Sequence, residues 1–285
     1  MPELPELQAL AEGLDRALAG RVIEDARAHA PATLKTAEPP LADLVGRRVE
    51  RVWRRGKLVG VGVDAEGGLT LVMHLMQAGR LGLAPKPEGR PGRTAALDVD
   101  VGGGQVLRLR ELSSRRRASA HLLDAEGLAA HRPLARLGPE PLGLGAAGWQ
   151  AALGGEGAVL HGALRDGRRV AGIGRAYASE IMWAARLAPF ARAGSLDDDQ
   201  VARLAAAADT VLGQALDRAR RRIDTDMPNR EARVTAVHRH AGEPCLRCGT
   251  RLERVSFADY ELVYCPTCQT GGRVYRDRRM SRLLG

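Results

Sequence analysis

The sequence predicts an α+β protein of several domains: an N-terminal β-sandwich with flanking helices, a helical domain and a small C-terminal ribbon. Short β-branched or alternating apolar runs, separated by glycines, fill residues 21–123 and are typical of antiparallel sheets. Apolar residues at helical spacing dominate residues 143–220. All four cysteines lie within residues 245–268, and 285 residues are enough for two or three domains.

The first element is a helix that follows a short extended lead. Apolar side chains recur at helical spacing from Leu4 to Leu18, and Pro5 suits a first turn. Such a helix would hold Pro2 rigidly. If Met1 is removed, the secondary amine of Pro2 becomes a potential covalent catalyst, because an α-amino group with a pKa of about 7.7–8.0 is partly deprotonated near neutral pH. Proline at position 2 is common by chance, so this interpretation needs support from elsewhere in the chain.

The residues from about 21 to 123 are predicted to form a sandwich or barrel of antiparallel strands. The clearest strand-like runs are Arg48–Trp53, Leu58–Val63, Leu69–Leu75 and Val106–Leu109. Lys57 lies in a basic turn between two of these runs, and His74 lies near the end of a third, three residues before Gln77. A solvated hairpin tip and a structural histidine are the simpler interpretations of Lys57 and His74.

A linker is predicted at Leu137–Leu142, and helices follow it. One helix is predicted over Arg175–Leu187. Ser195, with Asp198 three residues on, has the pattern of a capping box that opens a second helix to about residue 220. Residues 224–233 are polar and loop-like. The predicted domains are therefore 1–132, 133–234 and 235–272, followed by a basic tail at 273–285.

A glycine pair directly precedes the first of these helices, as Gly172-Ile173-Gly174. Glycines there let the backbone approach a ligand, and the N–H groups at a helix start favour a phosphate. Arg175 adds a cation at the same place. A tight turn between helices would produce the same pattern, so this signal is weak by itself.

The cysteines form two Cys-x-x-Cys pairs, Cys245 with Cys248 and Cys265 with Cys268. Sixteen residues separate the pairs, which is the spacing of a four-cysteine zinc ribbon. Two disulfides are the alternative, but the chain carries no export signal that would favour them. The sequence therefore predicts one structural Zn²⁺, bound by four thiolates that leave no open position for chemistry.

The composition favours a polyanionic partner. The net charge is +9 and the pI is about 10.1, so nucleic acid is the first candidate. The abundance of alanine, glycine and arginine indicates a compositional bias, so a single arginine carries less weight than one of the three lysines. No apolar stretch of about eighteen residues and no signal-peptide pattern occurs, so we expect a soluble protein that is not exported.

Several motifs follow one another in a specific order. They are Met1-Pro-Glu-Leu-Pro-Glu6, the hairpin Lys57, His74-Leu-x-x-x-Gly79, Gly172-Ile-Gly-x-x-Tyr-Ala-x-Glu-Ile181 and the four-cysteine ribbon. In these motifs the chain resembles the formamidopyrimidine-DNA glycosylase/endonuclease VIII family, from Met1 to about Thr270. The resemblance implies a β-sandwich, a helix–two-turn–helix domain and a zinc ribbon that together hold double-stranded DNA.

The resemblance also implies a role for each candidate residue. A damaged nucleotide would be flipped out of the duplex, and the Pro2 nitrogen would attack the sugar C1′, displace the base and form an iminium. Glu3 would help to open the sugar ring, and Glu6 would support its geometry. Lys57 would transfer a proton or contact a phosphate in the elimination that breaks the strand. Phosphate contacts are implied for His74, Gly174 and Arg175.

Two departures from the family pattern affect phosphate binding. The family commonly has asparagine after Gly-Ile-Gly, where this chain has Arg175, a longer charged fork. The ribbon of the family carries an arginine five residues before the third cysteine, where this chain has Tyr260. Arg254 or an arginine of residues 273–282 could substitute for it.

Two more departures affect recognition of the damaged base. In the oxoguanine enzymes a methionine, an arginine and a phenylalanine fill the space that the flipped nucleotide leaves. The methionine position falls on Gln77, next to Met76, and the arginine–phenylalanine loop is replaced by residues 113–117, which include Arg116 but no phenylalanine. The loop that folds over oxoguanine is shortened to Ile223–Arg233. These differences favour the endonuclease VIII side of the family, which prefers oxidised pyrimidines.

The sequence therefore predicts a bifunctional DNA glycosylase and abasic-site lyase of base-excision repair. It would act as a monomer on double-stranded DNA that contains a damaged base or an abasic site, at the bacterial nucleoid in the cytoplasm and without membrane contact. Removal of Met1 would be a condition for activity. A non-catalytic damaged-DNA-binding protein on the same scaffold is the alternative. A zinc-ribbon RNA-binding or transcription factor would explain the cysteines and the charge but not the N-terminus.

Overall fold

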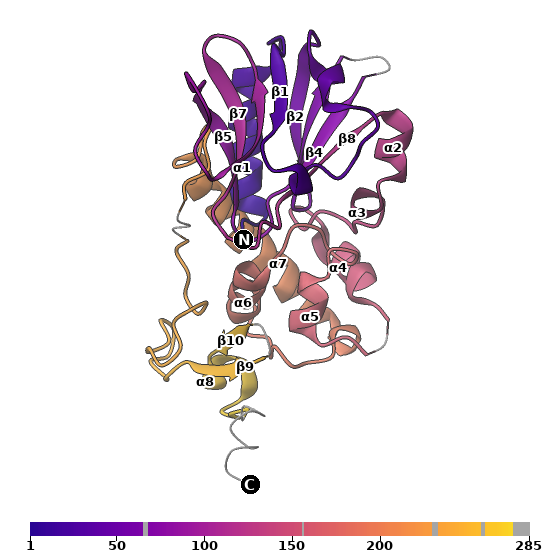
Figure 1. Cartoon of the computed structure of the whole chain (residues 1–285). Coiled ribbons are helices and arrows are strands. Elements are labelled where there is room, and N and C mark those ends of the chain that lie inside the picture. The colour runs from indigo at the N-terminus through magenta and orange to yellow at the C-terminus, as the bar shows by residue number, and fades with distance from the viewer. Residues whose placement is uncertain (65–67, 156, 230–232, 258–259, 276–285) are drawn as a thin grey trace. The chain divides into compact units, whose positions relative to one another are not determined.

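The computed structural model divides the chain into two compact units (Figure 1). Unit 1 comprises Met1–Arg136 and Leu216–Ala232, and unit 2 comprises Leu137–Ala215 and Arg233–Gly285. The structure describes residues 1–64, 68–155, 157–229, 233–257 and 260–275. Most of the predicted basic tail lies outside the described residues, and the predicted domain boundaries at 132, 234 and 272 stay predictions.

Unit 1 contains the predicted β-sandwich, built from two antiparallel sheets of four strands each. The strands of one sheet, in spatial order, are β1 (Asp25–Ala28), β6 (Ala95–Asp100), β7 (Gln105–Glu111) and β5 (Gly79–Pro85). Those of the other are β2 (Val49–Arg55), β3 (Leu58–Val63), β4 (Thr70–His74) and β8 (Ser119–Leu123). Two short 3₁₀ turns, η1 (Pro31–Thr33) and η2 (Leu41–Leu44), follow β1, and α2 (Ala125–Ala130) and α3 (Arg132–Ala135) follow β8.

The N-terminal helix α1 (Leu4–Leu18) occupies the residues that its apolar periodicity predicts. Five leucines on one face of α1, from Leu4 to Leu18, are at most 1% exposed. The helix packs against β2 and β3 of one sheet and against β5 of the other. Burial of such a leucine stabilises a fold by about 1.5–3 kcal/mol, so α1 is held firmly and fixes the start of the chain.

The segment 216–229 belongs to unit 1 although it follows the helices of unit 2 in sequence. Met227 N–H donates to the Leu81 carbonyl at 3.0 Å, and Leu83 N–H donates to the Thr225 carbonyl at 2.8 Å, so this segment pairs with the free edge of β5. Asp226 faces Gly82, where a Cβ would lie 2.0 Å from the Asp226 Oδ1 atom. The sequence pattern predicts a polar loop here and misses its attachment to the sheet, because a bare glycine on β5 is what permits the approach.

Unit 2 is built around a helical core. Its helices are α4 (Gly145–Leu153), α5 (Leu160–Arg165), α6 (Arg175–Ala184) and the part of α7 (Asp198–Arg220) up to Ala215, and the short turn η3 (Ala193–Ser195) precedes α7. Trp149, Ile181 and Leu204 are among its fully buried side chains. Among the described residues, no helix is both long enough and apolar enough to cross a membrane.

The ribbon of unit 2 consists of the antiparallel pair β9 (Glu253–Ser256) and β10 (Glu261–Tyr264) and the short helix α8 (Pro266–Thr270). Glu180, on the buried side of α6 and 6% exposed, anchors the segment that leads into it. The Glu180 carboxylate accepts hydrogen bonds from the N–H groups of Ala236, Val237 and His238, at 2.7, 3.0 and 2.8 Å. A single buried carboxylate thus satisfies three consecutive backbone donors at the ribbon entry.

Two helix ends differ from the prediction. The helix α6 ends at Ala184 rather than at Leu187, because Arg186 adopts a left-handed conformation with φ +56° that terminates the helix. The predicted capping box of Ser195 and Asp198 is wrong by two residues. The Gln200 N–H donates to the Asp197 Oδ1 atom at 2.7 Å, and the Asp197 N–H donates to the Gln200 side chain at 3.1 Å.

Candidate functional site

One end of the sandwich in unit 1 gathers the segments that carry the predicted catalytic residues. Arg54, at the end of β2, donates to Gln8 near the start of α1 at 2.9 Å, whereas Val52 N–H donates to Asp15 further along the helix. The helix therefore runs antiparallel to β2, and its N-terminus lies at the β2–β3 hairpin. His74 ends β4 and pairs with Leu58, the residue after that hairpin. The predicted residues of α1, Lys57 and His74 thus share one end of unit 1.

The N-terminal residues are held by the start of α1. Pro2 is buried, and Glu3 and Glu6 are 3% and 8% exposed. The Glu6 Oε2 atom accepts a hydrogen bond from the Glu3 N–H at 2.9 Å, so Glu6 fixes the backbone on which Glu3 is carried. With Met1 attached, the Pro2 nitrogen is an amide and cannot act as a nucleophile. Only the chain without Met1 offers the amine at this place.

Lys57 lies in a two-residue connection between β2 and β3, whose flanking residues Arg55 and Leu58 pair with each other. Gly56 has φ +57°, the value that a type II′ hairpin turn requires at its first position. Lys57 is half-buried, so it is not the solvated hairpin tip of the simpler interpretation. Burial lowers the pKa of His74 to about 4, and the nearby positive charge of Lys57 adds to this effect. His74 is therefore neutral near pH 7 and can donate one ring N–H.

Two loops lie at the same end of the sandwich. The turn between β4 and β5 exposes Gln77, and Met76 beside it is half-buried with φ +52°. The β7–β8 loop ends where Ser119 pairs with His74. It carries Arg116, which is exposed and has φ +39°. Gln77 and Arg116 therefore both extend from turns close to the end of β4.

In unit 2, Gly174 and Arg175 lie at the start of α6. Gly174 is the residue that precedes the first turn, and the buried Ile173 fixes the approach of the chain. Arg175 is half-buried, and its guanidinium carbon lies 4.7 Å from the centroid of the Tyr260 ring. The structure thus brings together two of the residues at which the sequence departs from the family pattern.

The four cysteines bring their sulfur atoms together in unit 2. All four Sγ atoms lie within 4.8 Å of one another, with Cys245–Cys268 at 4.0 Å and Cys248–Cys265 at 3.5 Å. A tetrahedral Zn²⁺ with bonds of about 2.3 Å spaces its sulfurs by about 3.8 Å, whereas a disulfide needs about 2.05 Å. Trp183 donates its indole N–H to the Cys245 sulfur at 3.4 Å. The residues fit one zinc ion, and the disulfide alternative does not fit.

Comparison with known proteins agrees with this arrangement. Family models match three successive segments: the formamidopyrimidine-DNA glycosylase N-terminal domain at residues 1–118, the H2TH domain of that enzyme at 137–226, and the zinc finger found in FPG and IleRS at 242–271. A formamidopyrimidine-DNA glycosylase of Chloroflexus aggregans is 37% identical, over 94% of this chain and 98% of its own length. That of Cereibacter sphaeroides is 33% identical, over 94% and 100%.

The chain belongs to the formamidopyrimidine-DNA glycosylase family.

Solved structures of the family share the fold. A complex of MutM with DNA that contains carbocyclic 8-oxo-G has a TM-score of 0.81 and 23% identity, and covers 94% of this chain and 100% of its own. A complex of Lactococcus lactis Fpg with abasic-site DNA has a TM-score of 0.81 and 21% identity, with 94% and 99% covered. Family membership confirms the predicted enzyme class, a DNA glycosylase of base-excision repair, and the predicted zinc ribbon.

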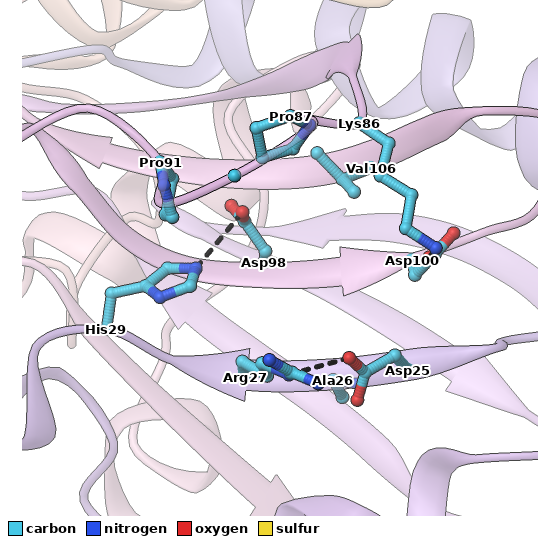
Figure 2. Close-up of a pocket in the computed structure, with 11 residues that line it drawn as sticks. Asp25, Ala26, Arg27, His29, Lys86, Pro87, Pro91, Asp98, Asp100 and Val106 are labelled. Carbon is cyan, nitrogen blue, oxygen red and sulfur yellow. Dashed lines mark hydrogen bonds and ion pairs between the residues drawn. The ribbon is translucent and has the colours of Figure 1, made fainter.

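A separate pocket of about 220 Å³ in this family member lies over β1, β6 and β7 of unit 1 (Figure 2). Its charged side chains already pair with one another. His29 contacts Asp98 at 3.1 Å, and Lys86 contacts Asp100. Arg27 contacts the carboxylate of Asp25 at 2.7 Å. None of the predicted catalytic or DNA-binding residues lines this pocket, so it does not belong to the candidate site.

Two features of unit 2 are not predicted from the sequence: the buried Glu180 and the residues that surround Tyr260. Glu180 could have been found, because a carboxylate in the middle of an otherwise apolar helical face needs a partner. His161, Arg165 and Phe257 surround Tyr260, and their sequence positions carry no signal of this. Their association depends on how the hairpin β9–β10 packs against α5.

Proposed function

We propose that the chain without Met1 is a bifunctional DNA glycosylase and abasic-site lyase that uses Pro2 as its nucleophile. The observation that carries the proposal is that Pro2, Glu3, Glu6 and Lys57 all lie at one end of the sandwich, in a chain of this family. Solved structures with the same fold are complexes with DNA that contains a damaged base or an abasic site. Double-stranded DNA with such a lesion is the substrate that these likenesses support.

The chemistry follows from the properties of a secondary amine. The lone pair of the Pro2 nitrogen attacks C1′ of the damaged nucleotide, the C1′–N bond to the base breaks, and the base leaves with a proton. Glu3 donates a proton to the ring oxygen as the sugar opens, so that the Pro2 nitrogen and C1′ form an iminium. Glu6 holds Glu3 through the backbone contact described above and acts as a positioning residue.

The iminium then makes strand cleavage possible. It withdraws electrons from C1′ and so acidifies the protons on C2′. Loss of one of them lets the C3′–O bond break, and the 3′ phosphate leaves. Lys57, half-buried in its hairpin, either accepts this proton or contacts the adjacent phosphate. Water finally hydrolyses the iminium and frees Pro2.

One nucleotide must be extruded from the duplex before this chemistry begins. In the proposal, the N–H groups at the start of α6, after Gly174, and the guanidinium of Arg175 bind a phosphate of the damaged strand. His74 donates a ring N–H to a neighbouring phosphate, and Arg116 contacts the duplex. Gln77, exposed at its turn, enters the space that the nucleotide leaves. The zinc ion holds the ribbon and takes no part in the reaction.

The residues of two turns at the end of the sandwich bear on the choice of lesion. A glutamine wedge and a β7–β8 loop without phenylalanine favour oxidised pyrimidines over oxoguanine, although the named relatives are formamidopyrimidine-DNA glycosylases. We expect the enzyme to act as a monomer at the bacterial nucleoid. Excision assays on duplexes that contain oxoguanine, ring-opened purines, thymine glycol or dihydrouracil determine the lesion.

Borohydride trapping on abasic-site DNA tests the proposal directly. The reagent reduces the iminium, so the chain without Met1 should form a stable covalent adduct. A chain that retains Met1, confirmed by mass spectrometry, should form none, and Glu3→Gln should slow base excision by about 10²- to 10⁴-fold. Glu12→Gln on the same helix, where Glu12 pairs with Arg220, is the matched control and should excise normally. Absence of an adduct with the mature chain would support the non-catalytic alternative.

A further inference from the structure

Tyr260 occupies the tip of the β9–β10 hairpin and is packed on several sides. The Phe257 N–H donates to the Tyr260 carbonyl at 2.7 Å, and the two rings stack with centroids 4.5 Å apart at an interplanar angle of 10°. The His161 ring lies 5.5 Å from the Tyr260 ring. The ring is therefore held in one orientation by an aromatic partner from its own hairpin and by α5.

Two guanidinium groups approach this ring from different helices. The guanidinium carbon of Arg165, at the end of α5, lies 4.3 Å from the ring centroid, and that of Arg175, at the start of α6, lies 4.7 Å away. Both distances are within the range of a cation–π contact. The two guanidinium carbons thus lie no farther than about 9 Å apart, which suits one phosphate or two neighbouring phosphates of a strand that rises about 3.4 Å per nucleotide.

Arg165 carries its positive charge beside the ring without a described acidic partner. Among the residues that the structure describes, no carboxylate pairs with Arg165. His161 is 3% exposed, and its pKa is lowered to about 3 by burial and by the positive charges of Arg165 and Arg175. The imidazole is thus neutral, and the positive charge that Arg165 brings to the ring can attract an anion.

The sequence suggests Arg254 or an arginine of residues 273–282 as a substitute for the missing ribbon arginine. The guanidinium carbon of Arg273 lies 5.1 Å from the centroid of the Tyr275 ring, and none of its described contacts is with Tyr260. Arg254 is exposed and lies 3.6 Å from the Glu261 carboxylate across the β9–β10 pair. The Glu261 carboxylate offsets part of the positive charge that Arg254 could offer to a phosphate. Residues 276–282 lie outside the described residues. Arg165 is therefore the better substitute, since it lies beside the ring that stands where the family has arginine.

We propose that Arg165 and Arg175, each in contact with the Tyr260 ring, form a two-arginine clamp for the phosphates of the DNA strand. Arg165 supplies the charge that the ribbon lost, and Tyr260 is a positioning residue that orients both guanidinium groups. The clamp depends on the proposed function only in taking DNA as the ligand.

Salt-dependent binding to a duplex with a stable abasic-site analogue tests the clamp. Arg165→Gln should weaken binding about fivefold near physiological salt. The negative slope of log K against log salt should become less steep by about 0.9, the value for one phosphate contact. Arg254→Gln removes the same charge from the ribbon and is the matched control, with an unchanged slope. An unchanged slope in Arg165→Gln, or an equal loss in Arg254→Gln, would overturn the proposal.

A second set of variants tests the role of Tyr260. Tyr260→Leu should lower the affinity for DNA and make the dependence of log K on log salt less steep. Tyr260→Phe keeps the ring and should therefore bind almost as tightly, and with almost the same salt dependence, as wild type. Tyr260→Arg, which returns the family residue, should rescue the slope of Arg165→Gln. Thermal unfolding of each variant detects misfolding, and a Tyr260→Leu variant that folds and binds like wild type would show that the ring positions nothing.

Borohydride trapping separates this inference from the proposed function. If the mature wild-type chain forms no adduct but Arg165→Gln still lowers the salt slope, the proposed catalysis is wrong and the clamp is supported. If trapping succeeds and the slope of Arg165→Gln equals that of wild type, the clamp is wrong and the catalytic proposal is unaffected.

Discussion

Replacement of Glu180 by glutamine tests how the ribbon is attached to the helices of unit 2. Its Oε1 atom accepts from Val237 and His238, and its Oε2 atom accepts from Ala236. Glutamine keeps one oxygen, which can still accept two of these bonds. It places an amide NH₂ group against the third donor. The variant has almost the same shape, so its effect reports the charge and the lost acceptor.

The magnitude follows from these contacts. A hydrogen bond to a charged group contributes about 1.5–3 kcal/mol, and a charge-assisted bond is about twice as strong as a neutral one. In Glu180→Gln one hydrogen bond is lost and the other two are made to a neutral oxygen instead of a carboxylate. The free energy of unfolding should therefore fall by about 2–4 kcal/mol. Because Glu180 is 6% exposed, water replaces the lost acceptor poorly.

Urea unfolding followed by circular dichroism measures this loss, and a colorimetric chelator measures zinc release in parallel. Zinc should leave Glu180→Gln at a lower urea concentration than wild type, because the ribbon entry is no longer held. Glu243→Gln is the control, since Glu243 is exposed and pairs only with His240 among the described contacts. If Glu180→Gln unfolds and releases zinc like wild type, the three bonds do not anchor the ribbon.

Three further predictions concern zinc, pH and the edge of the sandwich. Cys265→Ser should release zinc and lower the affinity for abasic-site DNA in anisotropy titrations, and full affinity without zinc would contradict a structural ribbon. The pKa of His161 is lower in the folded chain than its ordinary value, so the unfolded chain binds the proton first as the pH falls. The contribution of His161 to the free energy of unfolding should therefore fall by about 1.4 kcal/mol per pH unit from about pH 6 to pH 4. In urea titrations, His161→Phe should show a free energy of unfolding that depends less on pH. Gly82→Ala would place a Cβ 2.0 Å from the Asp226 Oδ1 atom and should destabilise the chain by about 1–3 kcal/mol, whereas Gly89→Ala, which meets open space, should unfold like wild type.

Periodic local signals account for the elements that could be predicted. The helix Leu4–Leu18 and the strand Leu58–Val63 match their predicted ranges, because apolar spacing decides burial on one helical face or in a central strand. The start of α7 could not be placed so well. Serine and aspartate are both good helix caps, and only the folded chain shows that Asp197 is the cap and that Ser195 bonds back to Arg192 instead.

Contacts between distant residues account for what could not be predicted. The attachment of residues 224–229 to β5 needs a glycine opposite Asp226, and nothing in the polar sequence of that segment indicates its partner. The cysteines are the opposite case. Their identity and spacing alone define a tetrahedral sulfur site, which the sulfur positions then fit.

Tyr260 shows why a position-by-position comparison with a family loses information about binding. Compared alone, Tyr260 is a lost arginine and Arg175 is an altered phosphate contact, and each favours a weaker or non-catalytic protein. In the folded unit 2 the guanidinium carbon of Arg175 lies 4.7 Å from the centroid of the Tyr260 ring, and that of Arg165 lies 4.3 Å from the same centroid. A tyrosine can orient cations that it cannot itself replace, so the two departures and a third residue belong to one cluster. In the proposed clamp the positive charge for DNA is a property of the cluster, so its loss at one position is offset at another.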